Sequence, residues 1–211
     1  MNTSAEREFG FKLPTEENWL KPDDVWAHFV PLGDGIPPPD ARYASSIWLA
    51  EVREPTMSAD VPLEIRSLFE VARSSIIYGY LCYPLLTLGE EQLYRVLETA
   101  ARMKADKLGC PRVQGCRGDP DRRASFDVAI RWLNEKEVIS SADIRWWKCA
   151  KELRNYFSHP EMQRIQMPGQ AVQSLHMTAE LTSSLFVEKG AQPSEVQSSS
   201  APLASSAVIG R

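Results

Sequence analysis

Apolar residues that recur at steps of three and four are the feature that most constrains this chain. They begin after Asp60 and return in each later segment that lacks proline and glycine. This spacing places the apolar side chains on one face of an α-helix, whereas a half-buried strand would alternate at every second residue. No segment shows that alternation convincingly. We therefore predict an all-α bundle of about four to five main helices.

Proline, glycine and serine mark the ends of the expected helices. Pro62 suits a first helical turn, Pro84 closes the first long helix, and Gly109 is a natural stop for the second. A serine suits the start of the fourth helix. The expected helices cover residues 60–83, 87–109, 124–139, 140–159 and roughly 169–188.

The composition divides the chain into three parts. Residues 1–59 are rich in aromatic side chains and prolines, and we expect them to form an N-terminal extension with short helices that packs on the main domain. Residues 60–188 form the helical domain. Residues 189–211 are rich in serine and alanine and lack any period, which predicts a disordered tail.

The net charge of −4 and the isoelectric point near 5.5 argue against a protein that coats nucleic acid through bulk charge. The charge is unevenly distributed, however. Residues 1–101 carry 8 Lys and Arg against 16 Asp and Glu, while residues 102–211 carry 16 against 12. A polyanionic partner such as RNA is therefore expected to meet the second half.

The cysteines and the apolar runs indicate a cytoplasmic protein without a membrane span. The longest uncharged run, Ser74 to Gly89, is short for a span and is broken by a proline. The start of the sequence does not resemble a secretory signal, so we expect free thiols. The five-residue gap between Cys110 and Cys116 exceeds the usual spacing of zinc ligands, and we expect no metal and no cofactor.

A basic segment lies between the second and third helices. Residues 110–123 are rich in glycine, proline and arginine, which predicts a loop. The loop and its flanks, residues 102–123, carry seven basic and three acidic side chains. A solvated basic loop and a phosphate-contacting arm are both compatible with this composition. In the second case mobile arginines would bind phosphate through paired hydrogen bonds; the candidates are Arg112, Arg117, Arg122 and Arg123.

The stretch "RNYFSHP" holds the main candidate for chemistry. His159 precedes Pro160, which pushes it out of the helical conformation, and a histidine near neutrality suits proton transfer. Arg154 lies five residues earlier, about 140° around an ideal helix. The two side chains converge only if the helix unwinds or a second subunit contributes its own copy. Alternatively, both residues merely stabilise a helix end. His28 and His176 have no spaced partner and are expected to be structural.

The sequence resembles the HEPN superfamily, the higher eukaryotes and prokaryotes nucleotide-binding domains. The resemblance covers about residues 60–188 and includes the late Arg-polar-spacer-His motif, the two long helices before it and a closing helix that ends in "SSLF". It implies an α-helical bundle that forms a homodimer through the motif-bearing helices. Many members are metal-independent ribonucleases in toxin–antitoxin or phage-defence systems, so RNA and an antitoxin-like protein are the implied partners. By similarity, Arg154 and His159 are the catalytic pair, supported by Asn155 and Ser158.

Three interpretations follow from the sequence. The first is a homodimeric HEPN-type endoribonuclease. The second is a non-catalytic module of the same fold that binds RNA, a nucleotide or a protein. The third is a structural interaction domain in which Arg154 belongs to an internal salt bridge.

Overall fold

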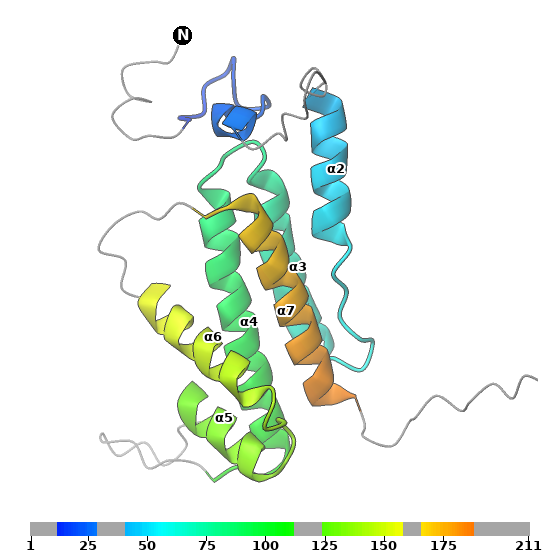
Figure 1. Ribbon diagram of the computed structural model, residues 1–211, viewed down its shortest axis with the longest axis vertical. Helices are drawn as coiled ribbons and strands as arrows, with labels where there is room; N and C mark the ends of the chain where they lie inside the picture. The colour runs from blue at the N-terminus through cyan, green and yellow to red at the C-terminus, as the bar shows by residue number, and fades with distance from the viewer. Residues whose placement is uncertain (1–11, 29–40, 112–123, 158–165, 188–211) are drawn as a thin grey trace, which may run out of the picture.

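A computed structural model describes residues 12–28, 41–111, 124–157 and 166–187 (Figure 1). Over these ranges the regular elements are helices, as the apolar periodicity predicts, and the all-α class is confirmed. No helix in these ranges is long and apolar enough to cross a membrane. The elements are η1 (Asp24–His28), α2 (Ala41–Arg53), α3 (Leu63–Tyr78), α4 (Leu85–Lys107), α5 (Phe126–Glu135), α6 (Ile144–Phe157) and α7 (Pro168–Phe186).

Helix α4 lies at the centre of the bundle. Its 23 residues extend over about 34 Å, and it packs against α3, α5, α6 and α7 (Figure 1). The short connection between α3 and α4 makes these two helices antiparallel neighbours. Helices α5 and α6 cover the part of α4 nearer its C-terminal end, while α7 runs along its length. The layout leaves α6 and α7 side by side on α4.

The apolar positions predicted from the sequence form the core. On each long helix most of them lie on the face that contacts its neighbours and are nearly or completely inaccessible to solvent, whereas Leu68, Ile144, Leu153 and Val172 are only half-buried. The expectation of one buried stripe per helix is confirmed for Ile65, Phe69, Ala72 and Ile76 of α3, Leu93, Val96, Leu97 and Ala100 of α4, Phe126, Ile130 and Leu133 of α5, and Leu175, Ala179, Leu181 and Leu185 of α7.

Helix α3 ends earlier than predicted. The sequence places its end at Tyr83, before Pro84, but the last helical residue is Tyr78 and Gly79 caps it. A Cβ atom added at Gly79 would overlap the side chain of Leu86, which belongs to the next helix. The chain turns back here because glycine propagates a helix poorly and permits this close approach. The expected end at Tyr83 is therefore wrong by one and a half turns.

Gly89 brings α3 and α4 into close contact. A Cβ atom at this position would overlap Cγ1 of Ile76 and would lie 3.0 Å from the carbonyl oxygen of Ala72. The latter atom belongs to the helix backbone, which cannot move away as a flexible side chain would. Gly89 thus sets the distance between the two longest neighbours in the bundle.

Replacing Gly89 with alanine is expected to lower the free energy of unfolding by about 1 to 3 kcal/mol, although alanine is the better helix former. The matched control is Gly169→Ala in the first turn of α7, where an added Cβ meets nothing within 4 Å. That variant is expected to be neutral or up to about 1 kcal/mol more stable. Urea unfolding followed by circular dichroism compares the two, and equal effects would contradict the close-approach argument.

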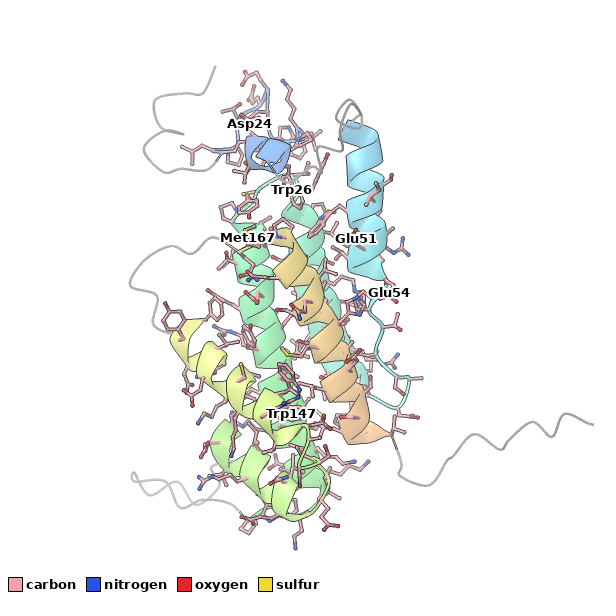
Figure 2. All side chains as sticks on the ribbon, viewed as in Figure 1. Asp24, Trp26, Glu51, Glu54, Trp147 and Met167 are labelled. Atoms are coloured by element: carbon pink, nitrogen blue, oxygen red, sulfur yellow. The ribbon has the colours of Figure 1, made fainter. Side chains whose placement is uncertain are left out.

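Aromatic residues before α3 pack against the end of the α3–α4 hairpin. The Trp26 ring lies 4.7 Å from that of Trp48 and 5.3 Å from that of Tyr80, measured between centroids. Trp26 is labelled in Figure 2. Its indole nitrogen donates a hydrogen bond to the carbonyl oxygen of Gly79 at 3.0 Å. The Asp23 carboxylate accepts one from the Tyr83 amide at 2.9 Å. These contacts hold η1 on the hairpin.

The tail predicted at residues 189–211 lies outside the described residues.

Candidate functional site

Helix α6 carries the start of the candidate motif and begins at Ile144, four residues after the serine at which the sequence predicts its start. The Ser140 hydroxyl accepts a hydrogen bond from the Asp143 amide at 3.0 Å and donates one to the Asp143 carboxylate at 2.6 Å, just before the helix starts at Ile144. The helix continues to Phe157. Ser158 and His159 lie outside the described residues, so the spatial relation of His159 to Arg154 stays a prediction.

Arg154 lies in the last turn of α6 and is bound to α4. Its Nε donates to Oε2 of Glu98 at 2.8 Å, and the other oxygen of the same carboxylate accepts from Arg102 at 3.1 Å. The Arg154 side chain is 36% exposed and that of Glu98 13%. Arg154 also donates to the Asn155 side chain, at a long 3.4 Å. The salt bridge of the third interpretation is therefore present, but the arginine is only partly buried.

A second ionic group joins α6 to α5. The Lys151 ammonium donates a hydrogen bond to Asp127 at 3.0 Å, and this bond holds the pKa of the Asp127 carboxyl below its usual value. Arg131 contacts the same carboxylate at 2.6 Å. Hydrogen bonds to Glu152 and Asp127 raise the pKa of Lys151 in turn. Since Asp127 is 43% exposed, we assign these pairs to holding the two helices in register and not to catalysis.

The remaining residues predicted from the sequence are placed as follows. The four candidate phosphate-binding arginines, Arg112, Arg117, Arg122 and Arg123, lie outside the described residues, as do Cys116 and the side chain of His28. Cys82, Cys110 and Cys149 are free thiols. The described part of the chain holds no group of three or more His, Cys, Asp or Glu residues arranged to bind a metal ion.

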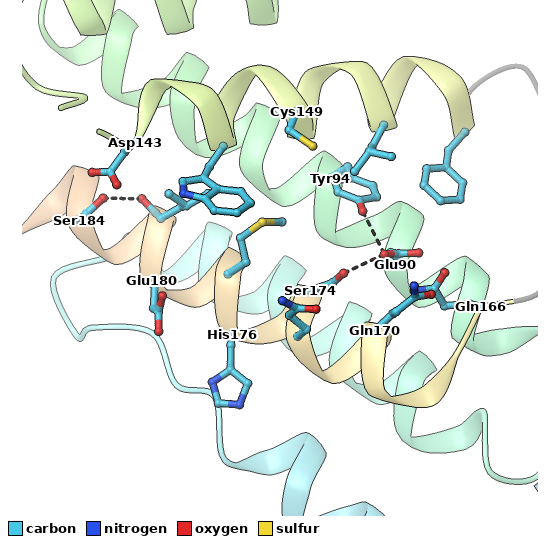
Figure 3. Close-up of a pocket in the computed structure, with 16 residues that line it drawn as sticks. Glu90, Tyr94, Asp143, Cys149, Gln166, Gln170, Ser174, His176, Glu180 and Ser184 are labelled. Carbon is cyan, nitrogen blue, oxygen red and sulfur yellow. Dashed lines mark hydrogen bonds between the residues drawn. The ribbon is translucent and has the colours of Figure 1, made fainter. Parts of the chain in front are cut away.

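A groove of about 720 Å³ lies between α6 and α7, with α4 at its base (Figure 3). Sequence reasoning did not predict it. Residues from all three helices and from the segments before α6 and α7 line it: Glu90, Tyr94, Asp143, Trp146, Cys149, Leu153, Phe157, Gln166, Gln170, Gln173, Ser174, His176, Met177, Glu180, Leu181 and Ser184. Arg154 is not among them, so α6 presents the arginine and the groove on different faces.

A buried polar cluster lies at the base of this groove. Glu90 is only 5% exposed, and its Oε1 accepts hydrogen bonds from the Tyr94 hydroxyl at 3.0 Å and the Ser174 hydroxyl at 2.8 Å (Figure 3). Burial and the neighbouring Glu90 raise the pKa of the Tyr94 hydroxyl well above its usual value. Tyr94 therefore acts as a hydrogen-bond donor at all ordinary pH values, and the cluster ties α7 to α4 beneath the groove.

His176 has a partner that its sequence neighbours do not reveal. Its Nε2 lies 3.1 Å from the carboxylate of Glu54, which directly follows α2. Figure 2 labels Glu54, and Figure 3 labels His176 on α7. The histidine was expected to be structural because no partner stands near it in sequence. The contact spans more than a hundred residues and forms only when α2 docks beside α7.

One signal in the sequence did point to the groove. Glu90 falls among Leu86, Gly89, Leu93 and Leu97, on the side of α4 that is otherwise apolar. A carboxyl at such a position requires polar partners inside the fold, because leaving it unpaired in the core costs several kcal/mol by the usual order of magnitude. The identity of those partners, Tyr94 and Ser174, depends on how α7 packs on α4.

Comparison with protein-family models, with curated proteins and with solved structures finds no match to this chain. The chemistry of the two sites thus rests on their own residues. The α6 terminus offers a cation fixed by a carboxylate, which suits an anionic ligand. The groove offers carboxyl, hydroxyl and aromatic groups, and the described residues contribute neither lysine nor arginine to its lining.

Proposed function

We propose that the chain is a HEPN-type, metal-independent endoribonuclease that acts as a homodimer through the ends of its α6 helices. The observation that carries this proposal is the position of Arg154, in the last turn of α6 with its Nε fixed by Glu98. A carboxylate on Nε orients the plane of a guanidinium, and phosphate is commonly bound through paired hydrogen bonds from such a plane. The weak bond to Asn155, at 3.4 Å, is one that a phosphate oxygen can replace.

The proposed reaction needs one phosphate-binding group and one proton carrier. The ribose 2′-oxygen attacks the adjacent phosphorus while His159 accepts its proton. The bond from phosphorus to the 5′-oxygen breaks, and that oxygen takes the proton back from His159, which leaves a 2′,3′-cyclic phosphate and a 5′-hydroxyl. Arg154 stabilises the charge that develops on the phosphate. A toxin–antitoxin or phage-defence setting in the cytoplasm, with an antitoxin-like partner, belongs to the same proposal.

The test is cleavage of end-labelled single-stranded RNA by the purified full chain, with and without a chelator. We expect cyclic-phosphate products in both conditions and none with His159→Ala, whose circular dichroism spectrum should match the wild type. Cleavage that persists in the variant, or that the chelator abolishes, contradicts the proposal.

A second candidate is a non-catalytic binding module of the same fold, and the Glu98–Arg154 ion pair favours it. A carboxylate 2.8 Å from the guanidinium offsets part of the charge that would attract a phosphate. This candidate predicts that RNA stays intact over long incubation while fluorescence anisotropy still reports binding, and that Arg154→Ala weakens this binding.

A further inference from the structure

The groove between α6 and α7 is elongated. Its lining runs from Trp146 to Phe157 along α6 and from Gln170 to Ser184 along α7. At 1.5 Å per residue these stretches extend over about 17 and 21 Å. A helix of about 12 to 14 residues has this length, whereas a typical metabolite is much shorter. The shape therefore suits a linear, helical occupant.

The groove is lined by polar and apolar side chains together, and the apolar ones include large side chains that solvent still reaches. Trp146 is 44% exposed, and Met177 and Leu153 are half-buried, although all three line the groove. Phe157 and Leu181 add apolar surface deeper in. A mixture of aromatic, leucine and methionine side chains is typical of grooves that accept the apolar face of an amphipathic helix.

The charged groups of the groove are mainly acidic. Asp143 and Glu180 stand along its length and Glu90 lies at its base, while His176 is the one basic side chain that the described residues bring to the lining. His176 is itself paired with Glu54. The guanidinium of Arg145, which is not a lining residue, lies 5.1 Å from the centre of the Trp146 ring. The carboxylates favour a cationic occupant and disfavour a phosphate-bearing one.

We propose that this groove is the docking site for an amphipathic helix of a protein partner, with apolar residues on one face and lysine or arginine beside them. The apolar face would contact Trp146, Leu153 and Met177, and the basic residues would lie near Glu180 and Asp143. This inference is independent of RNA cleavage, because the face of α6 that lines the groove does not include Arg154. A nucleic acid would be repelled by the carboxylates that attract the helix.

Two labelled 18-residue peptides test the proposal. Both carry leucines at helical spacing on one face; one carries lysines beside them and the other glutamates. Fluorescence anisotropy with the full chain is expected to show saturable binding of the lysine peptide alone. Cys149 reports the location, since it is exposed and lines the groove. The bound peptide should slow its alkylation by iodoacetamide, measured by mass spectrometry of proteolytic fragments, without slowing that of Cys82.

Charge-reversal variants supply the matched comparison. Glu180→Lys, an exposed position in the groove, should weaken binding of the lysine peptide by about five- to tenfold. Glu64→Lys makes the same charge change at an exposed site on α3 that contributes nothing to the groove, and binding should not change. Equal binding of both peptides, equal effects of both variants, or unprotected Cys149 would overturn the proposal. So would protection of Cys149 that rises with protein concentration without peptide, because a second copy would then be the occupant.

Discussion

Replacing Arg154 with alanine is expected to reduce RNA cleavage by about 100-fold or more while lowering stability by less than about 1 kcal/mol. The large effect on rate follows from its proposed contact with the phosphate. The small effect on stability follows from the 36% exposure of its side chain, because an ion pair near solvent contributes little. Arg154→Lys should restore little activity, since an ammonium cannot make paired, planar hydrogen bonds.

Arg102→Ala is the matched control for this experiment. Arg102 binds the other oxygen of the same Glu98 carboxylate, so its loss also leaves that carboxylate with one arginine fewer. If Arg154→Ala acts only by freeing Glu98, the two variants should reduce cleavage equally. If Arg154 binds the phosphate, cleavage should fall far more in Arg154→Ala. Single-turnover cleavage rates and urea unfolding of both proteins separate these outcomes.

The helices could be predicted from the sequence because their signals are local. Each apolar stripe repeats within one segment, and capping residues such as Ser140 act within a turn of their own position. The error at the end of α3 has the opposite origin. Gly79 is an ordinary interruption in a helical pattern, and the need for glycine there comes from the Leu86 side chain, which a Cβ atom at Gly79 would overlap. That contact exists only after α3 and α4 have packed.

The sites were less predictable because tertiary contacts define them. The motif drew attention to Arg154, but its partner Glu98 lies 56 residues away on another helix. The groove combines side chains of α4, α6 and α7, with no spacing in sequence that joins them. Glu90 is the exception, because a carboxyl on an apolar stripe indicates by itself that buried hydrogen-bond donors must lie next to it.

Helix α6 takes part in both proposals, because one of its faces carries Arg154 and another lines the groove. One face directs Arg154 toward α4, and another lines the groove with Trp146, Cys149, Leu153 and Phe157. A helix docked in the groove would contact Phe157, the last residue of α6 and two positions before His159. Such a helix would leave Arg154 uncovered, because the arginine does not line the groove. Measuring RNA cleavage in the presence of the lysine peptide connects the two experiments.

Trp147 is the position where truncation is expected to reduce stability most. Its side chain is completely buried, and its ring lies 6.5 Å from that of Phe126, nearly at right angles, where α6 crosses α5. Trp147→Ala should lower the free energy of unfolding by about 3 to 5 kcal/mol and the melting temperature by about 6 to 20 °C. Circular dichroism at 222 nm during urea and thermal unfolding measures both quantities.

Neighbouring substitutions show whether that loss comes from the cavity. Trp146→Ala removes the same side chain from the adjacent residue, which is 44% exposed, and should cost less than about 1 kcal/mol. Trp147→Phe keeps most of the ring and removes an indole N–H that has no acceptor among the described residues, so it should cost less than about 2 kcal/mol. If Trp147→Phe were as damaging as Trp147→Ala, the indole nitrogen rather than the buried volume would hold α6 in place. If Trp146→Ala were as damaging, the apolar wall of the groove would be part of the core and closed to a partner helix.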